Sequence, residues 1–264
     1  MNVIGLMIGK KSSAGVPGKN ISSVGGRKLC EYGLLAAKDS RYINKIYVST
    51  DCPTIKQTAI DYQLEVIDRP KRLHDPETLT EDVLDHAHIV IKEKEENFDY
   101  YVLLYANGGF INSKMIDDAI EKLHKNQTYD SCVGTINADM FTPIWAKSIN
   151  SKNELVPFID LKYFGDITSN RDSAGSAFFI DLSLQIIKPK CFEEMDGSQK
   201  PFLWLGHKIL PYLKDFGGDL DALWQYPILE KWVKENFFER KLDNSIWRSS
   251  LVKPCPCSWY KLEE

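Results

Sequence analysis

Short apolar runs alternate with amphipathic stretches along the first half of the chain, and this alternation restricts the fold more than any other feature. The runs are rich in β-branched and aromatic residues and are typical of strands over Val3–Ile8, Lys45–Ser49, Tyr100–Leu104 and Ser131–Thr135. The intervening stretches carry apolar residues at helical spacing over Leu29–Lys38, Pro53–Tyr62, Leu79–Lys92 and Ser113–His124. Strands that alternate with helices predict a Rossmann-like, three-layer α/β/α fold with a mainly parallel sheet, whose functional site lies at the carboxyl ends of the strands.

The second half of the chain is less regular. Ser176–Asp181 resembles one more strand and Pro227–Asn236 a late helix, but the rhythm is irregular over about residues 142–206. No repeat or low-complexity linker separates the two halves. We therefore expect one domain over residues 1–236 with an irregular insertion at 142–206, followed by a C-terminal arm over residues 237–264.

Composition and charge exclude several classes of protein. A chain of 264 residues that is 43% hydrophobic can bury a core, and its net charge of −4 argues against broad binding to nucleic acid or anionic membranes. No apolar run approaches the roughly 18 residues of a membrane span, and Lys10 and Lys11 interrupt the first run where a signal peptide would continue. The cysteines are scattered except Cys255 and Cys257, as expected of buried thiols in a reducing compartment. A cytoplasmic protein without nucleic-acid or membrane partners is expected.

The stretch "GKKSSAGVPGKN" directly follows the first predicted strand. Glycine, serine and lysine at this place offer backbone N–H groups and ammonium charges to phosphate oxygens. The stretch is not a Walker A motif, because Gly18 is followed by Lys19-Asn20, and it lacks the G-x-G-x-x-G pattern of dinucleotide sites. On the residues alone, phosphate binding and an ordinary solvated loop are equally good interpretations.

Three blocks of sequence resemble the acylneuraminate cytidylyltransferases, the CMP-sialic acid synthetase family. "GKKSSAGVPGKNI" is similar to the signature loop of that family, and "GGRKLCEYGLLAAKDSRYINKIYVSTDCPTIKQTAIDYQLEVIDRP" continues the likeness through V-S-T-D to Arg-Pro. "GHKILPYLKDFGGDLDALWQYPILE" resembles the late Asp-x-Asp segment of the family. The blocks cover about half of the chain in the family's order. The resemblance implies a nucleotide-diphospho-sugar transferase-like fold and a cytidylyltransferase that uses CTP and Mg²⁺, and a homodimer that pairs through the irregular segment.

The resemblance also implies roles for individual residues. Lys10 and Lys19 would be catalytic, because positive charge neutralises the pyrophosphate that leaves. Serine hydroxyls suit phosphate by hydrogen bonding, and Arg69 stands where the family has an arginine that binds triphosphate. The full set expected to bind nucleotide is Gly9, Lys10, Ser12, Ser13, Gly15, Lys19, Asn20, Arg69, Thr78 and Thr80.

Asp219 and Asp221 stand two residues apart in "GGDLDA". If this segment is extended, the two side chains share one face and can offer oxygens to one hard cation. Mg²⁺ needs only one or two carboxylates, because phosphate oxygens and water complete its shell. The other interpretation is an ordinary acidic turn after two glycines. With the remaining blocks present, we favour a metal site.

The part of the sequence that would bind the acceptor departs from the family. Its loop arginine is Lys10 here, which keeps the charge without the bidentate fork, and its second loop cation is Ala14. Its Q-P-T-S-P-x-R stretch is "YANGGFINS", which contains no arginine. The acceptor-binding candidates are Tyr105, Asn107, Lys162 and Arg171. The acceptor is then an unusual nonulosonic acid, a phosphonate or a phosphorylated acid, or else the protein binds nucleotide with weak or no turnover.

Overall fold

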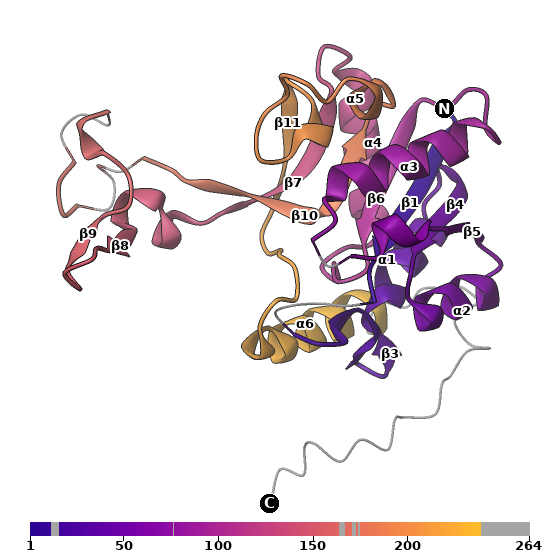
Figure 1. Ribbon diagram of the computed structural model, residues 1–264, viewed down its shortest axis with the longest axis horizontal. Coiled ribbons are helices and arrows are strands. Elements are labelled where there is room, and N and C mark those ends of the chain that lie inside the picture. Colours follow the sequence, from indigo (N-terminus) through magenta and orange to yellow (C-terminus); the bar gives the residue numbers. More distant parts are fainter. Residues whose placement is uncertain (12–15, 76, 164–166, 171–172, 174, 239–264) are drawn as a thin grey trace, which may run out of the picture.

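The computed structural model of the protein has an α/β body and a thin arm that projects from it (Figure 1). It describes residues 1–11, 16–75, 77–163, 167–170, 173 and 175–238, and every structural statement below refers to them. Helices cover both faces of a central sheet, so the predicted three-layer architecture is confirmed.

The central sheet has seven strands in the order β11-β7-β10-β6-β1-β4-β5. Their bounds are β1 Val3–Gly9, β4 Ile43–Thr50, β5 Glu65–Asp68, β6 Tyr100–Tyr105, β7 Ser131–Asn137, β10 Phe178–Ile187 and β11 Ile209–Lys214. Only β10 runs antiparallel to its neighbours β6 and β7 within this sheet. The local pattern of residues did not predict β5, which is short, or β11, whose Pro211 is tolerated because the strand lies at the sheet edge.

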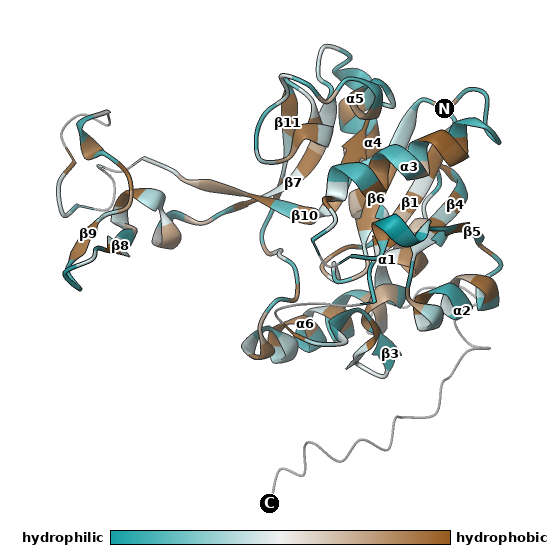
Figure 2. Ribbon diagram, viewed as in Figure 1, coloured by the Kyte–Doolittle hydropathy of each residue, from teal (hydrophilic) through white to brown (hydrophobic). Residues whose placement is uncertain are grey.

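Helices cover both faces of the sheet, and alternate side chains of each strand point toward the helices of one face or the other. Val3 and Met7 of β1 point into a core covered by α1 (Leu29–Lys38), α2 (Pro53–Asp61) and α4 (Ser113–Lys125). Ile4 and Leu6 point to the opposite face, under α3 (Thr80–Lys92) and α5 (Lys190–Glu193). Hydrophobic colour accordingly marks the strands between the helices in Figure 2. Strands buried on both faces read as continuous apolar runs, which is why the sequence revealed them.

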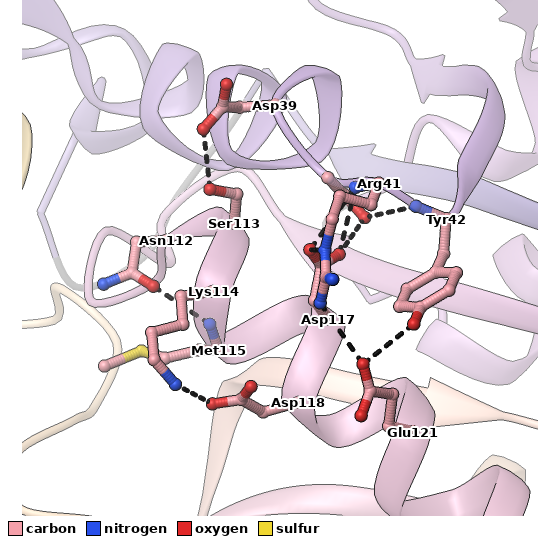
Figure 3. A network of polar contacts seen from close by, with 11 residues as sticks. Asp39, Arg41, Tyr42, Asn112, Ser113, Lys114, Met115, Asp117, Asp118 and Glu121 are labelled. Atoms are coloured by element: carbon pink, nitrogen blue, oxygen red, sulfur yellow. Dashed lines mark hydrogen bonds and ion pairs between the residues drawn. The ribbon is translucent and has the colours of Figure 1, made fainter. Parts of the chain in front are cut away.

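Polar contacts fix the start of α4 against the end of α1 (Figure 3). Ser113 donates a hydrogen bond to Asp39 at 2.7 Å, and Arg41 Nε donates to Asp117 at 2.8 Å. The Asn112 side chain accepts from the backbone N–H of Met115 and caps the helix. These contacts hold α4, and with it the loop between β6 and α4, in a defined position.

A third, smaller core joins the two ends of the described chain. Helix α6 (Tyr226–Val233), which continues into a π-helical turn over Lys234–Phe238, contacts β2 (Ser23–Val24), which pairs with β3 (Arg27–Lys28). Leu229 and Val233 are buried there with Leu29 and Tyr32. This packing brings the segment that precedes α6 to the loop that follows β1.

The arm consists of the chain between β7 and β10, with the hairpin β8 (Lys147–Ile149) and β9 (Leu155–Pro157) at its far end (Figure 1). The strand predicted at Ser176–Asp181 is confirmed as part of β10, which returns from the arm to the body. The predicted division into a domain and a C-terminal arm stays a prediction, and residues 239–264 lie outside the described part of the chain. Among the described helices, none combines the length and the apolar character needed to cross a bilayer.

Candidate active site

A cavity of about 360 Å³ opens at the carboxyl ends of β1 and β6, where a mainly parallel sheet places its ligands. Most of the residues that the sequence indicated line this single cavity. They are Gly9, Lys10, Lys19, Asn20, Arg69, Thr78, Thr80, Tyr105, Asn107, Asp219 and Asp221.

The loop after β1 forms the first wall. Its backbone is fixed at two points: Asp51 accepts from Lys11 N–H at 2.9 Å, and the buried Asn20 donates from Nδ2 to the Lys10 carbonyl at 2.8 Å. The short 3₁₀ turn Lys19–Ile21 then presents Lys19 to the cavity. The site candidates Ser12, Ser13 and Gly15 lie outside the described residues.

Arg69, which follows β5, supplies a third cation to this wall. Its guanidinium is buried and donates to Ser49 Oγ at 3.0 Å and to the Ser49 carbonyl at 2.7 Å, with an Asp51 oxygen 3.9 Å away. Burial lowers the pKa of Arg69 to about 10, and the charge of Asp51 opposes that fall. Arg69 therefore stays charged at neutral pH in a fixed orientation, which suits an anionic ligand.

The segment between β5 and α3 and the start of α3 form the second wall, with Thr78 and Thr80 among apolar neighbours. Leu73 and Val83 supply the apolar contacts, and Asp75 contributes a carboxylate. Sequence reasoning missed Asp75, because an acidic residue in a predicted loop gives no signal by its type.

Tyr105, at the end of β6, lines the cavity. Its hydroxyl is shielded from solvent and has no hydrogen-bond partner among the described residues, and burial raises the pKa of Tyr105 above its ordinary range. A buried hydroxyl without a partner is costly, so this one is available to a ligand. Asn107 lines the cavity two residues further on.

Asp219 and Asp221 line the same cavity. Asp219 Oδ1 is shielded from solvent and lacks a hydrogen-bond partner within the described chain. Burial, with the charges of Asp181 and Asp221, raises the pKa of Asp219 to about 6. The Asp221 side chain is 65% exposed and pairs with Lys19, which is 12% exposed. A carboxylate oxygen buried without a donor fits a site completed by a cation.

These two carboxylates would be the protein's contribution to such a cation site. The described residues contain no group of three or more histidine, cysteine or acidic side chains placed to hold a metal. That donor set suits Mg²⁺, which takes most of its ligands from phosphate and water, and does not suit zinc.

One described candidate for acceptor binding is not brought to the cavity. Lys162 lies on the arm, where its side chain is exposed and pairs with Asp160 at 2.5 Å. Arg171 lies outside the described residues. Among the described residues, the cations that line the cavity are Lys10, Lys19 and Arg69.

A mainly parallel α/β sheet with a cationic loop after its first strand and two carboxylates facing that loop is typical of nucleotidyltransferases. The chain belongs to the cytidylyltransferase family, whose model matches residues 10–168. The resemblance to acylneuraminate cytidylyltransferases is thereby confirmed.

Similar proteins and structures extend this assignment. The chain is 29% identical over 202 residues to CMP-N,N'-diacetyllegionaminic acid synthase of Legionella pneumophila, covering 73% of this chain and 83% of that protein. It is 25% identical over 169 residues to pseudaminic acid cytidylyltransferase of Campylobacter jejuni, covering 62% and 72%. The structure of CMP:2-keto-3-deoxy-manno-octonic acid synthetase complexed with CTP superposes with a TM-score of 0.64 at 14% identity, covering 89% of this chain and 99% of that one. At that identity the likeness supports the fold alone.

Proposed function

We propose that the protein transfers CMP from CTP to a sugar acid of the nonulosonic type and releases pyrophosphate. An acceptor hydroxyl loses its proton to solvent as its oxygen forms a bond to the α-phosphorus, the bond from that phosphorus to the α–β bridging oxygen breaks, and pyrophosphate leaves with that electron pair. The observation that carries the proposal is that three cations and Asp219, whose Oδ1 has no hydrogen-bond partner within the described chain, line one cavity. Family membership and the named activities of the Legionella and Campylobacter relatives support it.

Lys10, Lys19 and Arg69 bind the triphosphate in this proposal. Arg69 is fixed by its bonds to Ser49, so its charge is oriented before the ligand arrives. Lys19 pairs with Asp221 and can exchange that carboxylate for a phosphate oxygen. Positive charge beside the leaving pyrophosphate lowers the barrier, because negative charge develops there as the bond breaks.

Asp219 and Asp221 would hold Mg²⁺. Bound there, Mg²⁺ would neutralise part of the negative charge of the triphosphate. The unpartnered Asp219 oxygen supports this assignment. Replacing both aspartates by asparagine should leave the fold intact and remove the Mg²⁺ dependence of turnover. Unchanged Mg²⁺ dependence would contradict the assignment.

Tyr105 and Asn107 are proposed to contact the acceptor, since they line the same cavity as the three cations. A role for Lys162 in acceptor binding requires that the arm of a second copy, or a movement of its own arm, bring this side chain to a cavity.

The decisive experiment measures pyrophosphate release with CTP, Mg²⁺ and a panel of acceptors. The panel contains legionaminic-type and pseudaminic-type acids, an octulosonic acid and a phosphonate. We expect release with at least one nonulosonic acid and weaker release with the phosphonate. CTP binding without release for every acceptor would instead indicate a nucleotide-binding protein without turnover.

We further propose a homodimer that pairs through the arm. The arm exposes large apolar side chains, including Phe141 at 68%, Ile149 at 69%, Leu155 at 73% and Phe158 at 65%, far more than a monomer keeps on a thin projection. Sedimentation at micromolar concentration should give a dimer, and Leu155→Asp should shift it toward monomer. A clean wild-type monomer would reject the proposal.

A further inference from the structure

The segment Gly217–Ala222 carries both candidate metal ligands and has little regular structure of its own. Two glycines begin it, and Gly218 has φ of 124°, a conformation that favours glycine. Such a segment needs contacts from elsewhere to place its carboxylates reproducibly. The backbone groups of the segment show where these contacts come from.

Hydrogen bonds from two backbone N–H groups fix the start of the segment. Gly218 N–H donates to Asp181 Oδ1 at 3.1 Å, and Asp181 is buried beside Lys214. Leu220 N–H donates to the Asn107 carbonyl at 3.2 Å, and the Leu220 side chain is buried in the third core. These contacts fix the residues on either side of Asp219 but leave Asp221 to another partner.

The side chain of Gln225 is that partner. Gln225 Oε1 accepts from the N–H groups of Asp221 and of Ala222, each at 2.7 Å, and Gln225 Nε2 donates to the Asp219 carbonyl at 2.9 Å. Gln225 thus bonds to the backbone of both aspartates at once. No other described side chain bonds to the backbone of both.

Within the described part of the chain, the other contact that restrains Asp221 is its ion pair with Lys19. In the proposed function Lys19 turns to phosphate when CTP binds, so this restraint is lost when the cation must be held. The three hydrogen bonds of Gln225 do not involve Lys19, so they remain when Lys19 turns to phosphate.

We propose that Gln225 is a positioning residue that orients Asp219 and Asp221 toward a divalent cation. It touches neither substrate nor cation and acts through three backbone hydrogen bonds. The inference rests on the proposed metal role of the two aspartates. Removing outer partners of metal ligands typically weakens metal affinity about 10- to 100-fold.

The test compares CTP affinity with and without Mn²⁺ by isothermal titration calorimetry, in the absence of acceptor. The ratio of the two dissociation constants reports cation binding and needs no turnover. Gln225→Ala should reduce the ratio about tenfold or more while the metal-free CTP affinity stays near that of the wild type. Gln225→Glu keeps the acceptor for Asp221 and Ala222 and should recover part of the ratio.

Leu229→Val is the matched control, because it weakens the packing of the same helix and leaves the hydrogen bonds of Gln225 in place. It should lower the melting temperature and keep the ratio. An unchanged ratio in Gln225→Ala, or an equal loss in Leu229→Val, would overturn the inference. If Gln225→Ala does not fold, the comparison uses Gln225→Glu. We expect its ratio to lie below that of Leu229→Val, and equal ratios in the two variants would overturn the inference. If Asp219→Asn/Asp221→Asn keeps the full wild-type ratio, the metal proposal fails first and the positioning role falls with it.

Discussion

Removal of Asp181 should destabilise the protein more than removal of an exposed charge does, because Asp181 neutralises the buried ammonium group of Lys214. Lys214 and Asp181 are both 0% exposed at the side chain and form an ion pair. Lys214 also donates to the Phe110 carbonyl and to Ser183 Oγ. Burial lowers the pKa of Lys214, and the Asp181 charge opposes that fall. Asp181→Ala leaves the cation without its counter-charge.

Asp181→Ala should lower the free energy of unfolding by about 3–5 kcal/mol, the typical cost of removing one partner of a buried ion pair. A domain of ordinary stability has about 5–15 kcal/mol in total, so the loss should be large. Asp181→Leu combined with Lys214→Met removes both charges and should recover part of it. Recovery should be incomplete, because the N–H groups of Ser183 and Gly218 also lose their acceptor.

Urea unfolding followed by fluorescence measures these changes in the free energy of unfolding. An unchanged slope of that free energy against urea concentration shows that the change is one of stability. The control is Asp68→Ala, which breaks the exposed pair with Lys56, where the side chains are 74% and 42% exposed. That variant should lose less than about 1 kcal/mol. If Asp181→Ala loses no more than Asp68→Ala, or if the double variant is no more stable than the single one, the buried-charge reasoning is wrong.

Three further predictions concern the site and the effect of pH. Lys19→Ala should lower kcat/KM for CTP roughly 10- to 150-fold, as expected for a charge-assisted bond of about 1.5–3 kcal/mol, and an unchanged value would exclude phosphate contact. Tyr105→Phe should raise the KM for one substrate by up to roughly tenfold without loss of stability, because its hydroxyl has no partner within the described chain; identical kinetics would show that no ligand uses it. Burial lowers the pKa of His88 despite the opposing charge of Glu193, so the unfolded state binds more protons and the free energy of unfolding should fall as pH drops through 6.5. The fall should be smaller in His88→Gln, and an equal fall in both would assign it to other groups.

Local periodicity was sufficient to predict the body of the fold and the loop after the first strand. Strands such as Val3–Gly9 are apolar on both faces, and helices such as Ser113–Lys125 carry an apolar stripe, so each element shows its environment in its own residues. The same holds for the cluster of glycine and lysine around Lys19, whose chemistry depends on residue types close together in the chain. Membership of the cytidylyltransferase family follows from the sequence for the same reason.

Only the tertiary structure showed what the distant residues do. The place of β10 between β6 and β7 depends on strand pairing over long separations, which no local pattern records. Asp221 meets Lys19, 202 residues away, because the third core packs α6 against the start of the chain. Lys214 looks like any surface lysine in the sequence, yet it is fully buried because Asp181 and Phe110 converge on it. The free energy of a charge is set by the atoms around it, and folding alone brings those atoms together.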